Sequence, residues 1–185
     1  PRKGLLPMEL DNSKTQANLM AAFAGECQAS IKYGYYADLA EAQGYQQMAD
    51  IFRETARNER EHAKLWFIEL NGGFKSTLDN LKDGATGENY EWSEMYPQFA
   101  EQAQAEGFDK IAKLMWAVAD IEKTHEARYL KLAGNVEDKQ VFKKPQPTAW
   151  ICKNCGYIYE GEQAPQQCPV CKYPQGYFEV RADNY

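Results

Sequence analysis

The chain has 185 residues and a formal net charge of -6. This acidic balance argues against a nucleic-acid partner, because no run of Lys or Arg is longer than a pair. No apolar stretch is long enough to predict a membrane span, and the segment PRKGLLPMELDN lacks the apolar core of a signal peptide, so we expect a cytoplasmic protein.

Four helices are predicted along most of the chain. Their approximate bounds, set by capping residues, glycines and the helical spacing of apolar residues, are 14–43, 45–70, 89–106 and 108–133. Ser13 with Gln16 predicts a capping box at the start of the first helix, and Gly134 predicts the end of the last. Pro97 predicts a kink in the third helix.

The connection between the second and third helices is the long one. Residues 74–88 mix Gly, Asp, Asn and Ser around a possible short helix, STLDNLKD. Two tight helical hairpins joined by one long crossover are typical of ferritin-like four-helix bundles, in which metal sites are built from inward-facing side chains. We therefore predict a mainly α protein with a ferritin-like four-helix bundle over residues 1–135.

The chain changes character after Gly134. Residues 136–148 are polar, include two prolines and are predicted to be a linker, whereas residues 149–185 are aromatic and rich in cysteine. So short a domain buries too little apolar surface to fold without a staple. Two C-x-x-C pairs separated by 12 residues predict a tetrahedral thiolate metal site made by Cys152, Cys155, Cys168 and Cys171.

The spacing of these cysteines suits structural zinc and redox iron equally well. Six aromatic residues close to them in the sequence are expected to shield the metal from water, namely Trp150, Tyr157, Tyr159, Tyr173, Tyr177 and Phe178. A neighbouring di-metal site would also need a source of electrons. Both points favour iron, and zinc stays as the alternative.

The two histidines of the chain, His62 and His125, each follow a glutamate by three residues. Residues three apart share a face of a helix, so each pair suits one metal ion. Counted from the predicted hairpin turns, both pairs lie level with carboxylates of the neighbouring helices. The predicted layer consists of Glu26, Glu59, His62, Glu91, Glu94, Glu122 and His125.

Carboxylates on an apolar seam must be neutralised, because their desolvation is costly. Five glutamates and two imidazoles suit two ions, iron or manganese, bridged by Glu59 and Glu122. The simpler alternative for the histidines is that they are hydrogen-bonded core residues. Glu94 is either a solvated residue or an extra ligand for an ion that changes ligands with its oxidation state. Tyr33, seven residues after Glu26, is either a hydrogen-bond donor to a ligand or a core aromatic.

Six motifs, in this order, closely resemble those of the rubrerythrin family. They are AAFAGECQAS, ETARNEREHAKL, EWSEMYPQFA, EKTHEARYL, CKNCGYIYEG and CPVC. The resemblance implies that the seven residues of the predicted layer bind two irons and that Glu59 and Glu122 bridge them. It also implies that one iron moves between Glu94 and His62 as its oxidation state changes, and that the C-terminal domain is rubredoxin-like.

The resemblance further implies a homodimeric peroxidase that reduces hydrogen peroxide to water and protects against oxidative stress. Its electrons would come from NAD(P)H through separate carriers, a rubredoxin or a reductase, and pass through the four-cysteine iron. Two other functions stay open. One is iron storage with a structural zinc ribbon, and the other is an oxygenase or desaturase with an apolar substrate channel.

Overall fold

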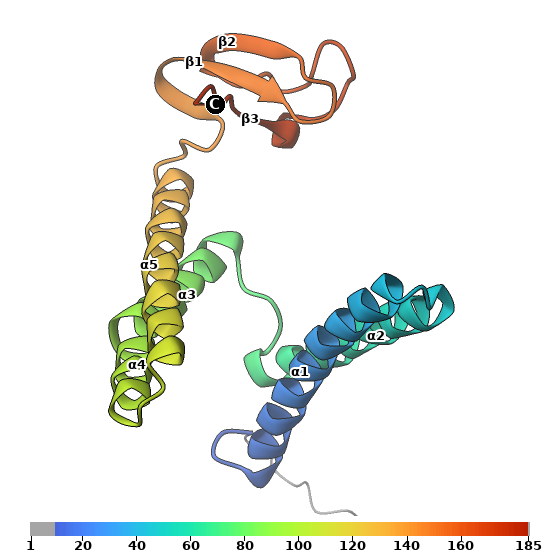
Figure 1. Ribbon diagram of the computed structural model, residues 1–185. Coiled ribbons are helices and arrows are strands. Elements are labelled where there is room, and N and C mark those ends of the chain that lie inside the picture. Colours follow the sequence, from blue (N-terminus) through green and yellow to red (C-terminus); the bar gives the residue numbers. More distant parts are fainter. Residues whose placement is uncertain (1–9, 185) are drawn as a thin grey trace, which may run out of the picture. The chain divides into compact units, whose positions relative to one another are not determined.

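The computed structural model describes residues 10–184 (Figure 1). The helices are α1 (Lys14–Ala42), α2 (Gln46–Asn71), α3 (Thr77–Tyr90), the π-helical turn η1 (Glu91–Met95), α4 (Tyr96–Ala105) and α5 (Asp109–Glu137). The strands are β1 (Lys143–Cys152), β2 (Ile158–Gln163) and β3 (Phe178–Val180), with a 3-10 turn, η2 (Gln175–Tyr177), before the last. The chain forms two compact units, which divide between Lys75 and Ser76.

Part of the prediction that no signal peptide is present concerns residues 1–9, which lie outside the described residues. Between residues 10 and 184, no helix combines the length and the apolarity that crossing a membrane requires.

The first unit contains the hairpin of α1 and α2. Its buried positions are small side chains from both helices, namely Ala37, Ala40, Ala49 and Ala63. Small residues let the two helices approach closely, and the hydroxyl of Ser30 donates a hydrogen bond across the hairpin to the carbonyl of Ala56 at 2.8 Å. The rings of Phe23 and Phe67 pack beside this seam, with centroids 6.0 Å apart.

The predicted start of the first helix is confirmed. Ser13 Oγ accepts a hydrogen bond from the backbone N–H of Gln16 at 3.0 Å. In return, Gln16 Oε1 accepts from the N–H of Asn12 at 2.8 Å, one residue earlier than in a capping box. The difference arises because the N–H of Ser13 already donates to the carbonyl of Leu10.

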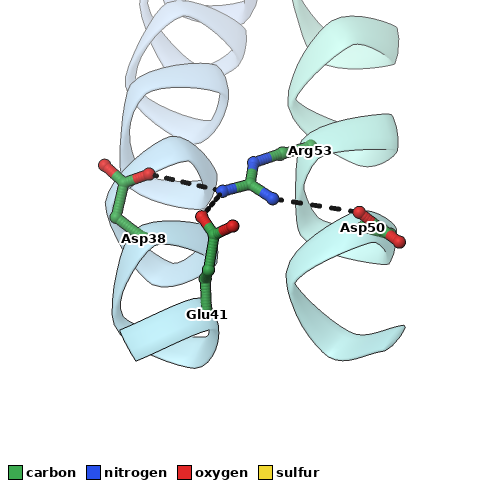
Figure 2. A network of polar contacts seen from close by, with 4 residues as sticks. All are labelled: Asp38, Glu41, Asp50 and Arg53. Atoms are coloured by element: carbon green, nitrogen blue, oxygen red, sulfur yellow. Dashed lines mark hydrogen bonds and ion pairs between the residues drawn. The ribbon is translucent and has the colours of Figure 1, made fainter. Parts of the chain in front are cut away.

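Near the turn of this hairpin, Arg53 of α2 lies among three carboxylates (Figure 2). Its guanidinium contacts Glu41 and lies 3.9 Å from Asp38 and 3.8 Å from Asp50. The hydrogen bond with Glu41 raises the pKa of Arg53, and the nearby carboxylate charges add to this effect. Exposed ion pairs contribute little stability, so this network adds little to the stability of the hairpin.

The short helix predicted around STLDNLKD is confirmed as the start of α3, but most of residues 74–88 are helical, so they do not form the predicted long connection. Helix α3 begins after Ser76, whose Oγ accepts a hydrogen bond from a backbone N–H three residues on at 3.1 Å, and only residues 72–76 connect it to α2. The glycines that suggested a loop are tolerated because α3 packs along α5. A Cβ at Gly84 would lie only 3.3 Å from the ring of Tyr129.

Just before Pro97, where a kink was predicted, the structure has the π-helical turn η1. The N–H of Tyr96 donates to the carbonyl of Glu91, five residues earlier. Proline has no N–H to donate, and its ring crowds the carbonyl four residues before it, here that of Ser93. The helix accommodates both effects by widening for one turn.

Gly134 does not end the last helix as predicted, since α5 continues to Glu137. Glycine inside a helix costs about 1 kcal/mol relative to alanine, a cost too small to end the helix by itself. The last turn of α5 carries an exposed ion pair to α3, between Glu137 Oε1 and Lys82 Nζ, 2.5 Å apart.

Regular structure therefore occupies most of residues 136–148, which were predicted to be a linker. Strand β1 already begins at Lys143, and its two prolines fall where the pairing with β2 is irregular, between Lys143 and Thr148. A missing N–H is tolerated at such positions. The division of the chain into domains at residues 1–135, 136–148 and 149–185 stays a prediction.

The C-terminal strands form an antiparallel sheet in the order β2-β1-β3, with Trp150 opposite Tyr159 on one side and Val180 on the other. Its core is small and consists of Trp150, Cys152, Ala164, Cys168 and Phe178. The indole N–H of Trp150 is satisfied by the carbonyl of Gly161 at 2.9 Å. Two of the five core side chains are thus cysteines of the predicted metal site.

Candidate metal centres

The four cysteines of the two C-x-x-C pairs meet in the C-terminal domain. Their sulfurs lie within 4.8 Å of one another, with 3.7 Å between Cys152 and Cys171 and 3.6 Å between Cys155 and Cys168. A tetrahedral site with metal–sulfur bonds of about 2.3 Å has sulfur–sulfur edges of about 3.8 Å. The donor set therefore fits one four-coordinate thiolate-bound ion, iron or zinc.

Two loops of the same shape present these sulfurs. Gly156 with φ 77° follows Cys155, and Lys172 with φ 63° follows Cys171. The N–H groups of Gly156 and Lys172 donate to the carbonyl of the first cysteine in each loop, at 2.8 and 3.0 Å. The hydrogen bond from the next backbone N–H, that of Tyr173, is the largest effect on the pKa of Cys171, which is lowered to about 6. The N–H of Tyr157 acts in the same direction on Cys155, but burial and the other three sulfurs raise the pKa of Cys155 to about 12.

The left-handed conformation predicts a test of this loop. Gly156→Ala should destabilise the four-cysteine domain by about 1 kcal/mol, because a residue with a Cβ is strained at positive φ. Gly176→Ala is the matched control, since a Cβ would meet nothing within 4 Å at either glycine and only Gly156 has positive φ. The measurement is the denaturant concentration that bleaches the iron-loaded protein, and equal midpoints for both variants would contradict the prediction.

Shielding of this site is one-sided. Cys152 and Cys168 are fully buried, whereas Cys155 is exposed and Cys171 partly so. Of the aromatic residues predicted to surround the metal, Trp150 and Phe178 are buried and Tyr157 packs against them, but Tyr159, Tyr173 and Tyr177 are about two-fifths exposed. The prediction of an aromatic shield thus holds for the inner half of the site.

The first hairpin brings together one half of the predicted carboxylate layer. His62 Nδ1 lies 2.8 Å from Glu59 Oε2 on the same helix and 3.9 Å from Glu26 Oε2 on α1. The two glutamates are partly buried, and all three side chains offer ligand atoms within 4.8 Å of one another. The positions three apart on α2 and the level of Glu26 on α1 are therefore as predicted.

The second unit repeats this arrangement with a different third member. His125 Nδ1 lies 2.7 Å from Glu122 Oε2 and 3.5 Å from Glu88 Oε2 on α3. Burial raises the pKa of Glu88, and its hydrogen bond with Glu122 raises it further. The sequence analysis missed Glu88, although it precedes Glu91 by three residues and this spacing is the signal that would have found it.

Glu91 and Glu94 lie in the π turn and not in the group around His125. Glu91 is partly buried and Glu94 is exposed. The pKa of Tyr96 is raised mainly by the burial of Tyr96, and the negative charge of Glu91 raises it further. A π turn is wider than an α turn, so side chains three apart diverge more than the sequence analysis assumed. The role of both residues as ligands stays a prediction.

Tyr33 lies on α1, two turns after Glu26. Its ring centroid is 6.2 Å from that of Phe52 and 6.1 Å from that of Tyr36. These contacts are those of a core aromatic, one of its two predicted roles. A hydrogen bond from Tyr33 to a ligand stays a prediction.

Both helical units thus carry a Glu-x-x-His pair joined by a carboxylate from a neighbouring helix. Carboxylates with one imidazole for each ion suit iron or manganese better than zinc or copper. Together with the four sulfurs, these donors define a class of protein, the ferritin-like carboxylate di-metal proteins with an added thiolate site.

Comparison with known proteins gives the family. The sequence model described as Rubrerythrin matches residues 17–133, and the one described as Rubrerythrin, rubredoxin-like domain matches residues 150–179. The chain is 43% identical over 196 residues to rubrerythrin of Porphyromonas gingivalis, covering 100% of this chain and 98% of the relative. It is 42% identical over 188 residues to rubrerythrin of Nitratidesulfovibrio vulgaris, covering 95% and 98%.

Among solved structures, nigerythrin in its partially reduced state is 33% identical, covers 92% of this chain and 91% of its own, and has a TM-score of 0.34.

The chain belongs to the rubrerythrin family. The predicted fold class is confirmed, namely a mainly α protein with a ferritin-like domain and a small rubredoxin-like domain. The protein is an oxidoreductase of the di-iron type. Its cofactors are two irons in the helical domain and one metal in the four-cysteine site, iron with zinc as a substitute.

Proposed function

We propose that this protein is a peroxidase that reduces hydrogen peroxide to two molecules of water and so limits oxidative stress. The observation that carries the proposal is the presence, in one chain, of two Glu-x-x-His groups and a four-thiolate site. Reduction of one peroxide needs two electrons and two protons. Two irons supply two electrons when bound, and the four-thiolate iron replaces them one at a time.

The proposed iron ligands are the seven residues of the predicted layer. Within the first unit Glu26 and Glu59 lie close to His62, and within the second unit Glu122 lies close to His125. Glu59 and Glu122 are proposed to bridge the irons, and they are the less exposed members of their pairs, at 19% and 14% of the side chain. Glu91 and Glu94 complete the set, and Glu94 and His62 would be alternative ligands of one iron in its two oxidation states.

We propose that Glu88, which lies beside His125 but outside the proposed ligand set, supplies one of the protons that peroxide needs. Burial raises the pKa of this carboxyl group, and its hydrogen bond with Glu122 raises the pKa further.

Electrons are proposed to reach the four-thiolate site from NAD(P)H through a rubredoxin or a reductase. The exposed sulfur of Cys155 supports this route, because a carrier protein can approach it directly. The proposal includes a homodimer in the cytoplasm. It includes no nucleic-acid and no membrane partner.

The proposal is tested by mixing the anaerobically reduced protein with hydrogen peroxide in a stopped-flow instrument. We expect the visible bands of the four-thiolate iron to return rapidly and about two electrons to be consumed for each peroxide. Bands that stay bleached while peroxide persists would contradict the proposal. A protein with zinc between its sulfurs that instead accumulates ferric mineral would be a storage protein.

A further inference from the structure

Trp92, in the π turn, is held by two side chains of α5. Its Nε1 donates a hydrogen bond to Glu126 Oε2 at 2.5 Å, and Lys123 Nζ lies 5.0 Å from the centroid of the indole ring. The other carboxylate oxygen, Glu126 Oε1, accepts from Asn89 Nδ2 at 3.0 Å. We call these four side chains the Trp92 clamp.

The clamp lies directly beside the candidate metal ligands on both elements. On α5, Lys123 and Glu126 each follow a ligand of the His125 group by one residue. On the other side, Asn89 and Trp92 flank Glu91, so Glu126 holds one side chain before and one side chain after this carboxylate. The clamp therefore fixes the segment from which Glu91 and Glu94 project.

A π turn needs such support. Turns of this kind are rare because the helix must widen to form hydrogen bonds over five residues. Pro97 disfavours the α-helical alternative by removing one donor, but it does not fix where the wide turn lies. A hydrogen bond to a carboxylate is about twice as strong as one between neutral groups, and Glu126 accepts two.

We propose that Glu126 is a positioning residue. By holding Trp92 and Asn89, it keeps the wide turn at Glu91–Met95 and so sets the directions in which Glu91 and Glu94 project. The importance of these directions for iron rests on the proposed function. The effect of Glu126 on the π turn does not.

Glutamine at position 126 separates positioning from simple packing. Its side chain has nearly the same shape, but it offers one oxygen and one NH2, so it cannot accept from both Trp92 and Asn89. Trp92→Phe removes the indole N–H, which is the donor of the hydrogen bond to Glu126. Glu101→Gln is the matched control, because it makes the same chemical change at an exposed position of α4.

The first measurement is amide hydrogen exchange of the full chain, prepared without metal, over residues 91–96. We expect exchange to be faster by about tenfold in Glu126→Gln and Trp92→Phe, and unchanged in Glu101→Gln, because the π turn opens locally without its clamp. Exchange at the wild-type rate in both clamp variants would overturn the proposal. If Glu126→Gln loses helical circular dichroism, Trp92→Phe alone decides.

The second measurement is the affinity of the full chain for cobalt(II). We expect the clamp variants to bind cobalt about tenfold more weakly, the usual effect of losing a residue that orients a ligand. In the double variant Glu126→Leu with Trp92→Phe, the loss should not exceed that of Glu126→Leu alone, because leucine already removes the acceptor of the indole N–H. Additive losses would overturn a role through Trp92.

The two proposals can fail separately. Altered exchange and cobalt affinity in the clamp variants, with a wild-type protein that does not react with peroxide, would leave the clamp standing and remove the peroxidase. A reactive wild type whose clamp variants exchange normally would remove the clamp alone.

Discussion

Replacement of Glu59 by glutamine is expected to leave the helical domain with fewer than two irons for each chain and to lower peroxide reduction by about 100-fold or more. Glu59 lies 2.8 Å from the imidazole of His62 and is only 19% exposed, so the amide would remove a buried negative charge from the iron site. Iron analysis after anaerobic loading and steady-state turnover measure the two effects.

Glu61→Gln is the control for this change. Glu61 stands on the same helix two residues away, is 67% exposed and pairs with Lys64 at 3.5 Å. We expect this variant to load iron and turn over like the wild type. An equal loss of iron and turnover in both variants would show that these depend on the total negative charge of α2 and not on ligation by Glu59. Full activity of Glu59→Gln would remove Glu59 from the proposed ligand set.

Replacement of Cys155 by serine is expected to abolish the visible bands of the four-thiolate iron and to reduce donor-linked turnover by about 100-fold or more, because a hydroxyl is a poor substitute for a thiolate ligand. Reoxidation of the helical-domain irons by peroxide in a single turnover should stay intact. Absorption spectra, single-turnover mixing and steady-state turnover with an electron donor separate these steps.

Cys27→Ser makes the same chemical change outside the four-cysteine site. Cys27 is a partly buried residue of α1, so serine there should leave the visible bands and the donor-linked rate unchanged. Steady-state turnover of Cys155→Ser at the wild-type rate would refute a relay through the four-thiolate iron.

Much of the fold could be predicted from local chemistry. Ser13 and Gln16 mark the start of α1 by their own hydrogen bond, and Gly72 ends α2 in the left-handed conformation that glycine favours. The four cysteines come together as expected, because two chelating loops of one shape leave few other arrangements. In each case the residues that carry the signal lie next to the structure they specify.

The segment from 74 to 105 was predicted only in part. The helices around STLDNLKD and over 89–106 are found, but not their connection through a π turn. Its glycines and asparagines favour a loop, but contacts with α5 stabilise a helix that begins at Thr77. Pro97 favours a π turn locally, but on our proposal the place of that turn also depends on Glu126, which binds Trp92 from 34 residues away. Local propensity is overruled where distant residues supply the stabilising contacts.

The parts of the iron site that were predicted depend on residues close together in the sequence, and the parts that were missed depend on how helices pack. The Glu-x-x-His pairs are local, and both are found with their facing side chains 2.7 to 2.8 Å apart. The position of Glu88 beside His125 depends on how α3 packs against α5, which the spacing of glutamates suggests but does not fix. Glu91 and Glu94 depend on the width of one turn.

The uneven burial of the four sulfurs gives the thiolate site an open side and a closed side. Cys152 and Cys168 belong to the core of their domain, while Cys155 reaches its surface. On the proposed route, a docked carrier would exchange electrons most rapidly across the Cys155 edge, because electron tunnelling weakens steeply with separation. The same carrier would also cover this edge and keep solvent away from the metal while it is bound.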